Sequence, residues 1–324
     1  MKKFTFFLIV TVSICFSSIN FYGQKIGKYP TISLVSDSQL EQLVNRAANA
    51  TLNKFAAKGI KPENLAVTVI DLRNPNQLKT ASFRGEEKIY PASVSKMFFL
   101  VALHQWLENG KLKMSPALQR VTKDMIVDSS NEATQYIVDA LTETSNGEEL
   151  SGKAFEKYAF KRNAVNRYFA SLNYQNIVIN QKTYCEDLYG RERQFWDAGK
   201  NRNYLTTNAT ARLMAEIALR KAVTANRSEQ MLELMKRDWE SEAKDTEDQA
   251  HGFTGITLKD LGLKGTKLWS KAGWTSNARH DVAYIETPDG LKLVICIYTE
   301  KFANERDILP SVAKIVLQGI GELK

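Results

Sequence analysis

Hydrophobic positions follow helical spacing through the middle of the chain and form short apolar runs toward both ends. Residues 37–58 place their apolar side chains along one stripe of a helix, with Asp37 as a candidate N-cap. Residues 65–72 (LAVTVIDL) are typical of a buried strand. An Asn-Pro-Asn turn follows, so residues 78–83 are predicted to return as the second strand of a hairpin.

The middle of the chain is predicted to be helical, and its end returns to strands. Residues 94–107 and 207–220 give the clearest helical patterns. Between these helices lies an irregular polar stretch, residues 181–205, which is long enough to predict a functional loop. Three strands and a last helix are expected after the helical block, at residues 267–271, 282–286, 291–298 and 305–323.

This order of elements predicts an α+β fold with one catalytic domain after residue 24. Strands from both ends of the chain would form one antiparallel sheet, flanked by the N- and C-terminal helices. That α/β lobe is expected to span about residues 30–88 and 255–324, with residues 89–254 inserted as an all-helical lobe. A cleft between two such lobes is a common place for a binding site.

The first 24 residues have the composition of a secretory signal peptide. Lys2 and Lys3 precede a charge-free apolar run, residues 4–16, and small or polar residues follow it. The run is shorter than the roughly 20 residues that span a bilayer. The alternative is a buried N-terminal strand. The leader predicts a periplasmic or secreted protein without a stable membrane anchor after cleavage.

Composition argues for a globular protein without a nucleic-acid partner, metal or cofactor. The 324 residues are 44% hydrophobic and 25% charged, and the net charge of +8 is scattered along the chain. The three histidines lack metal-ligand spacing. Once the leader is removed, Cys185 and Cys296 could pair, but Cys296 lies in an apolar run that favours a buried thiol. The chain is interpreted as a monomer.

Residues 93–96 (SVSK) carry the first candidate chemistry. Positions i and i+3 share a helix face, so Lys96 is expected one turn from Ser93. A serine hydroxyl becomes a nucleophile when a neighbour takes its proton, and a lysine whose pKa is lowered by its surroundings is such a neighbour. The helix N-terminus also offers N–H groups to a developing oxyanion. Taken alone, the tetrad fits a helix cap at Ser93 and a solvated Lys96 better.

Two later motifs change that interpretation. Residues 128–131 (DSSN) begin another helix, and residues 271–273 (KAG) lie on a C-terminal strand. With SVSK, they resemble the motif set of the serine β-lactamase and penicillin-binding protein superfamily, and their order resembles that of the class A β-lactamases. Residues 206–215 resemble the threonine-led helix after the omega loop of class A enzymes, and residues 279–283 resemble the strand after the lysine-bearing strand.

The resemblance implies a catalytic role for several matched residues. Ser93 is expected to be the acylated nucleophile. Lys96 is expected to be its base or a partner of that base, an assignment that is disputed in the family. Ser129 would relay a proton to the leaving nitrogen, and Asn131 would hold Lys96 and the side-chain amide of the substrate.

The third motif and its neighbours are expected to bind the substrate. Lys271 would supply positive charge near the substrate carboxylate, and Ala272 and Gly273 would continue the substrate-binding strand. The N–H groups of Ser93 and Trp274 would form the oxyanion hole. Arg279 is expected either to anchor the substrate carboxylate or to be a surface arginine of its strand.

The chain departs from the family pattern at three places. Ala272 stands where the family has a Thr or Ser hydroxyl that binds the substrate carboxylate, and Ser130 replaces an Asp. The omega-loop signature is absent, but Glu192 precedes Thr206 by 14 residues, the spacing of the class A deacylation base. Glu192 is therefore expected to be that base, with Glu186 as the second candidate. The alternative for Glu192 is an ion pair with its flanking arginines.

Three functions remain open at this point. The leading expectation is an exported serine hydrolase that acylates Ser93 and hydrolyses a β-lactam. The second is a cell-wall D-Ala-D-Ala peptidase or esterase that shares the acylation step. The third is a catalytically silent relative that binds peptidoglycan. The presence of the nucleophile, both lysines and Ser129 argues against the third function, whereas Ala272 and the unusual loop keep the second open.

Overall fold

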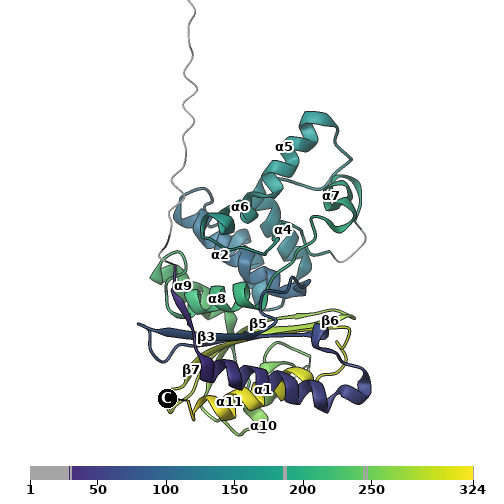
Figure 1. Ribbon diagram of the computed structural model, residues 1–324. Coiled ribbons are helices and arrows are strands. Elements are labelled where there is room, and N and C mark those ends of the chain that lie inside the picture. Colours follow the sequence, from purple (N-terminus) through teal and green to yellow (C-terminus); the bar gives the residue numbers. More distant parts are fainter. Residues whose placement is uncertain (1–28, 30, 185–187, 244, 246, 324) are drawn as a thin grey trace, which may run out of the picture.

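A computed structural model describes residues 29, 31–184, 188–243, 245 and 247–323, and places helices on both faces of one sheet (Figure 1). The expected leader, Cys185 and Glu186 lie outside these residues. The sheet has the strand order β1-β3-β2-β7-β6-β5-β4. Its strands are β1 (Leu34–Ser36), β2 (Leu65–Asp71), β3 (Leu78–Phe83), β4 (Lys236–Arg237), β5 (Lys267–Trp274), β6 (Ala278–Glu286) and β7 (Lys292–Glu300).

The sheet is antiparallel except at one edge. β2 lies between β3 and β7, and β5, β6 and β7 form a meander, so the strands expected from both ends of the chain do meet in one sheet. The edge strand β1 pairs with β3 in parallel, so the expected antiparallel sheet has one parallel pair at its edge. β1 and β4 have three and two residues, too few to leave a period-two pattern in the sequence.

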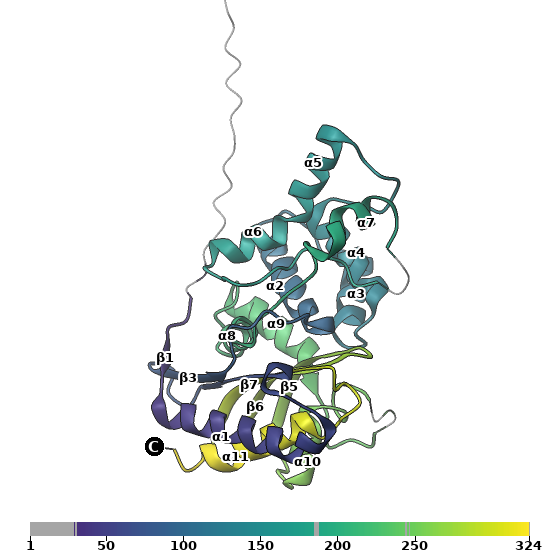
Figure 2. The ribbon, with the colours of Figure 1, turned by 45° about the vertical axis from the view of Figure 1, so that its right-hand side comes forward.

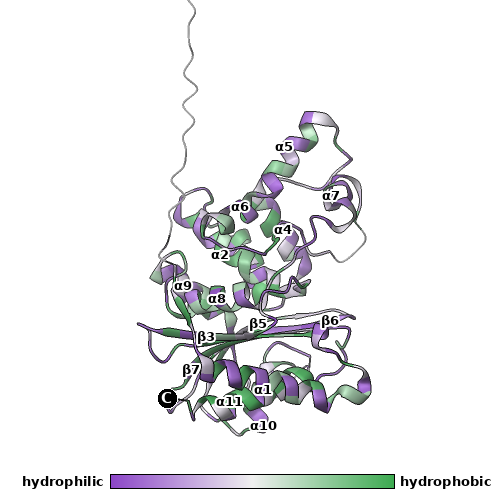
Figure 3. Cartoon of the chain, in the orientation of Figure 1, coloured by the Kyte–Doolittle hydropathy of each residue, from purple (hydrophilic) through white to green (hydrophobic). Residues whose placement is uncertain are grey.

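Three helices cover one face of the sheet: α1 (Ser38–Lys54), α10 (Thr254–Asp260) and α11 (Ile308–Ile320). Both ribbon views place α1 beside α11 under the sheet (Figures 1 and 2). The Asp37 side chain accepts a hydrogen bond of 2.9 Å from the Leu40 N–H, as the expected N-cap does. The apolar stripe of α1 is buried against the sheet and α11, and its exposed side is hydrophilic (Figure 3).

The opposite face of the sheet carries the helical lobe. Its central helix, α2, is apolar on nearly all sides and almost wholly buried, as expected for a helix surrounded by other helices (Figure 3). Helix α2 (Ser95–Glu108) packs against α3 (Pro116–Ile126), α4 (Asn131–Thr142), α6 (Ala164–Ser171) and α9 (Ala225–Met235). The lobe also contains α5 (Gly152–Arg162), α7 (Gly190–Trp196) and α8 (Thr207–Ala218). Short 3₁₀ helices are η1 (Ala56–Lys58), η2 (Pro62–Asn64), η3 (Ala92–Val94) and η4 (Asp197–Gly199).

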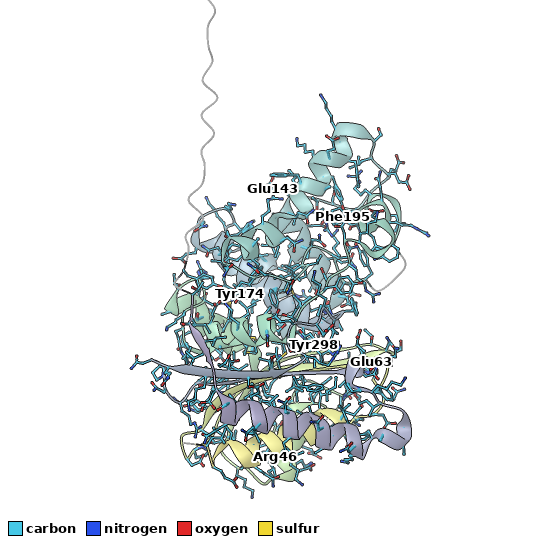
Figure 4. All side chains as sticks on the ribbon, viewed as in Figure 1. Arg46, Glu63, Glu143, Tyr174, Phe195 and Tyr298 are labelled. Atoms are coloured by element: carbon cyan, nitrogen blue, oxygen red, sulfur yellow. The ribbon has the colours of Figure 1, made fainter. Side chains whose placement is uncertain are left out.

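The two lobes are joined by α8, which lies on β2, β6 and β7. Tyr298 of β7 and Thr210 of α8 share a buried hydrogen bond of 2.8 Å, and Tyr298 lies at this boundary in Figure 4. Cys296, also on β7, is a buried free thiol, as its apolar surroundings in the sequence predict. Within the described residues, no helix has the length and apolar character of a membrane span. The expected α+β class is confirmed.

Candidate active site

Ser93 lies in η3, directly before α2, and its segment is held in an unusual conformation. Ala92 has φ +46°, a value that L-residues rarely adopt, and the Ser95 Oγ donates to its carbonyl over 2.8 Å. The buried His280 of β6 donates from Nε2 to the Tyr90 carbonyl over 2.9 Å. Burial lowers the pKa of His280 to about 4, so this imidazole is neutral near pH 7. These contacts fix the backbone on which half-buried Ser93 sits.

Lys96 is fully buried in the first turn of α2, one helical turn after Ser93. Its Nζ donates to the Ser129 carbonyl, lies 3.3 Å from the Ser129 Oγ and donates to the Asn131 Oδ1 over 2.9 Å. Asn131 begins α4, and its Nδ2 donates to the Tyr184 carbonyl over 3.3 Å. The solvated Lys96 of the alternative interpretation is therefore excluded.

Lys271 reaches Ser129 from the sheet side. Its Nζ donates to the Ser129 Oγ over 3.0 Å, so this hydroxyl lies between two buried lysines from different lobes. Burial, and then the positive charges of Lys96 and Arg237, place the pKa of Lys271 well below its usual range, and Asp281 opposes this shift. Ser129 has φ +57°, a strained value that fits a hydroxyl held in place by its surroundings.

At Gly273, β5 comes close to the backbone of residues 91–94, the segment that carries Ser93. A Cβ built at Gly273 would lie 2.7 Å from the Pro91 carbonyl oxygen and 3.0 Å from the backbone nitrogens of Ser93 and Val94. Only a glycine allows this approach of two backbones. Trp274, the next residue and the last of β5, is half exposed.

Glu192 is buried in an ion cluster at the base of the 181–205 loop. One carboxylate oxygen accepts from the Tyr158 hydroxyl over 2.6 Å and lies 3.1 Å from the Lys182 Nζ. The other accepts from the Tyr184 hydroxyl over 2.6 Å and lies 3.3 Å from the Arg162 guanidinium. Burial raises the pKa of Glu192, but Arg162, Lys182 and the two hydroxyls together outweigh burial, and the pKa lies below its usual range.

These contacts argue against Glu192 as the water-activating base. Each oxygen of the carboxylate accepts a hydrogen bond from a tyrosine hydroxyl and also lies within 3.3 Å of a cation, so protein groups surround the position where a base would hold water. The ion-pair alternative is also corrected, because the partners are Arg162 and Lys182 and not the flanking arginines. Glu192 instead holds Tyr184, whose carbonyl accepts from Asn131.

Arg279 is buried and turned toward the segment between β4 and α10. Its guanidinium donates to Glu247 over 3.0 Å and to the Gly252 carbonyl over 2.5 Å, and lies over the Phe253 ring. Arg279 is therefore not the surface arginine of the alternative expectation, and its two terminal nitrogens donate to protein groups. Ala272 is also buried, in the core cluster that contains Phe253.

Comparison with known proteins decides the family. The model of a β-lactamase enzyme family matches residues 47–320, most of the chain. This chain belongs to that β-lactamase family. Its fold is shared with the β-lactamase from Sphaerobacter thermophilus DSM 20745, at 17% identity over 87% of this chain and 98% of that one, with a TM-score of 0.62. PBP-A is similar at 18% identity over 91% of this chain and all of PBP-A, with a TM-score of 0.60. No curated protein matches the sequence.

Membership of the β-lactamase family supports a hydrolase of the serine β-lactamase or penicillin-binding protein type. The structure brings Lys96, Ser129, Asn131 and Lys271 into direct contact, and β5 against the segment that carries Ser93. Among the described residues, no group of three or more His, Cys, Asp or Glu side chains is arranged to hold a metal ion.

Two residues of this candidate site were missed by the sequence interpretation. His280 was considered only for metal binding, although the β5–β6 register places it opposite Gly273. Gln249 lies in an irregular segment with no motif, and its side chain contacts Lys271 and the N–H of Ala272. A strand register predicted to single-residue accuracy would have found His280, but nothing in the sequence marks Gln249.

We expect Gly273→Ala to lower kcat/KM for any acylating substrate by about tenfold to a hundredfold, because a displacement of about 1 Å in a reacting group has an effect of that size. The added methyl group meets backbone atoms of residues 91–94, and backbone atoms cannot rotate away as a flexible side chain can. Steady-state kinetics would measure the effect. Gly321→Ala is the matched control, because its Cβ would meet nothing within 4 Å and its φ of −64° suits alanine. Equal activity of both variants would contradict the close approach.

We expect Glu192→Gln to lower the free energy of unfolding by about 3 kcal/mol near pH 7, because it removes the carboxylate beside buried Arg162 and leaves buried Lys182 with Asp139 alone. Since the pKa of Glu192 is lowered on folding, its stabilisation is present above about pH 4 and is lost as the pH falls through the folded-state pKa. Urea unfolding near pH 7 and below about pH 4 would measure the loss of stability at each pH, with the exposed Glu233→Gln as the control. If Glu192 is instead the base, the variant keeps its stability and accumulates acyl-enzyme.

Proposed function

We propose that this chain is an exported serine hydrolase that forms an acyl-enzyme on Ser93 and hydrolyses the amide bond of a β-lactam. One observation carries the proposal: Lys96 from the helical lobe and Lys271 from the sheet converge on the Ser129 hydroxyl, beside the segment that presents Ser93. Export after removal of residues 1–24, a periplasmic or secreted location and a monomeric state are parts of the same proposal.

The first half-reaction follows from these positions. The Ser93 Oγ attacks the lactam carbonyl carbon, and its proton passes to Lys96 or to a partner of Lys96. The Ser93 and Trp274 N–H groups bind the oxyanion. When the C–N bond breaks, Ser129 gives its proton to the leaving nitrogen and recovers one from a neighbouring lysine, each of which lies within 3.3 Å of its hydroxyl. The product is an ester between the substrate acyl group and Ser93.

Deacylation needs a water molecule to attack that ester, and a base to take its proton. Because two hydroxyls and two cations hold the Glu192 carboxylate, this role is open to Glu186 or Lys96. The same observation favours a second candidate function, a cell-wall D-Ala-D-Ala peptidase or esterase in which β-lactams form a long-lived adduct. One structure of a PBP-A mutant, with a TM-score of 0.57 to this chain, is an acyl-enzyme complex with penicillin G.

The lifetime of the acyl adduct separates the two candidates. The native protein is mixed with a chromogenic cephalosporin, and intact mass and absorbance are followed together. A β-lactamase forms product in many turnovers per enzyme and clears the adduct within seconds. A peptidase releases about one equivalent of chromophore and keeps the adduct for minutes to hours. A protein that shows neither hydrolysis nor adduct would contradict the proposed function. The remaining candidate would then be a catalytically silent relative that binds peptidoglycan.

A further inference from the structure

Two donors converge on one oxygen of Gln249. The Lys271 Nζ donates to the Gln249 Oε1 over 2.7 Å, and the backbone N–H of Ala272 donates to the same oxygen over 3.2 Å. An ammonium and a backbone N–H aimed at one point are what a carboxylate oxygen of a ligand requires. In this structure the carboxamide oxygen of the protein's own Gln249 occupies that point.

Lys271 has no hydrogen-bond donor left for a second partner in this arrangement. A protonated lysine has three N–H groups. The three acceptors around Nζ are the Gln249 Oε1, the Ser129 Oγ at 3.0 Å and the Ala272 carbonyl at 2.8 Å. A substrate carboxylate that binds Lys271 therefore has to displace one of them. Gln249 is the acceptor that can be displaced, because the other two are the Ser129 hydroxyl and the backbone of β5.

Gln249 is also held from its other end. Its Nε2 donates to the carbonyls of Ile126 over 3.0 Å and Val127 over 2.9 Å, so the side chain bridges the loop before Ser129 and the strand β5. Arg279 binds the segment that carries it, through Glu247 and the Gly252 carbonyl. Displacement of Gln249 therefore breaks several hydrogen bonds at once, which opposes binding of a charged ligand at this position.

We propose that Gln249 is a specificity-determining residue that occupies the carboxylate position beside Lys271 and favours acyl donors that are neutral there. The proposal rests on the proposed acylation of Ser93 for its catalytic consequence, but the binding consequence is independent of it. A carboxylated β-lactam enters only by displacing the Gln249 carboxamide, whereas an amide or ester without that carboxylate leaves the bridge in place.

The catalytic test compares benzylpenicillin with its methyl ester, because the two differ only in the carboxylate. In Gln249→Ala we expect the ratio of kcat/KM for the acid over the ester to rise about tenfold or more, the size of one hydrogen bond to a charged group. The exposed Gln119→Ala on α3 is the matched control and keeps the native ratio. A ratio that stays within twofold of native in Gln249→Ala, or that falls, would overturn the proposal.

The binding test does not need acylation. Calorimetry with benzylpenicillin compares Ser93→Ala with the double variant Ser93→Ala/Gln249→Ala. We expect the dissociation constant of the double variant to be about tenfold lower. Gln249→Glu in the same background keeps the size of the side chain, places a fixed carboxylate beside Lys271 and should weaken binding instead. If the double variant binds benzylpenicillin more tightly but the native protein is never acylated, this inference is supported and the proposed function is contradicted. Equal binding by all three variants would remove the inference alone.

Discussion

Ser93→Ala is expected to abolish both acylation and turnover, with a loss in kcat of about ten-thousandfold or more, as for the nucleophile of other concerted serine sites. Without the hydroxyl, the lysines and Ser129 have no oxygen to activate, and no ester is formed. The fold should be retained, because Ser93 is half exposed and its side chain makes no hydrogen bond in the described structure. Thermal unfolding would check this, and the exposed Ser145→Ala is the matched control.

A Ser93→Ala variant that takes up one acyl group per molecule at the native rate would place the nucleophile elsewhere. Ser129 would then be the next candidate, because its hydroxyl contacts both lysines. Ser129→Ala has a different expected signature, since it removes the proton relay to the leaving nitrogen but keeps the acceptor of the acyl group. Slow labelling of Ser129→Ala and none of Ser93→Ala would agree with the assigned roles.

Lys96→Ala is expected to slow acylation about a thousandfold, within the range by which a positioned general base accelerates a reaction. Lys96 is fully buried, and the Asn131 Oδ1 and the Ser129 carbonyl accept hydrogen bonds from its Nζ, so the side chain is held one helical turn from Ser93. Rapid-quench mass spectrometry of the acyl adduct would give the rate. Acylation of Lys96→Ala within tenfold of native would show that Lys96 is no base.

Lys96→Arg separates a base from a fixed positive charge. Arginine keeps the charge beside Ser129 and Asn131 but does not lose its proton in proteins. If Lys96 takes the serine proton, the arginine variant stays as slow as Lys96→Ala. Recovery of acylation in Lys96→Arg would reduce Lys96 to electrostatic support and would assign the base to another group.

The sequence predicted the layout of the fold well because long amphipathic segments dominate it. The apolar stripe after Asp37 specifies one buried helix face, whereas the continuous apolar runs of β2 and β7 are buried on both faces. Such strands are expected in a sheet that is covered on both sides. The motif residues that contact one another, Lys96, Ser129 and Lys271, were also found, because their types and order are those of a known family. Strands β1 and β4 were missed because they are too short to carry a pattern.

The partners of Glu192 and Arg279 could not be predicted, for one physical reason. Glu192 and Arg279 were judged by their distance along the chain from other motifs, but their roles depend on partners that are distant in sequence. Arg162 lies 30 residues before Glu192, and Glu247 lies 32 residues before Arg279. The structure shows both side chains buried against these partners, which the sequence did not predict. Charge pairing across loops leaves no periodic signal in a single sequence.

The identity of the acylated residue tests the central claim most directly. Native protein is mixed with benzylpenicillin, quenched in acid during the reaction, digested and mapped by tandem mass spectrometry. The account predicts one penicilloyl group, carried by Ser93 in the peptide that contains SVSK, and no adduct on Ser95, Ser129 or Ser130. An adduct on any of these other serines, or hydrolysis of the drug with no covalent intermediate under any quench time, would contradict it.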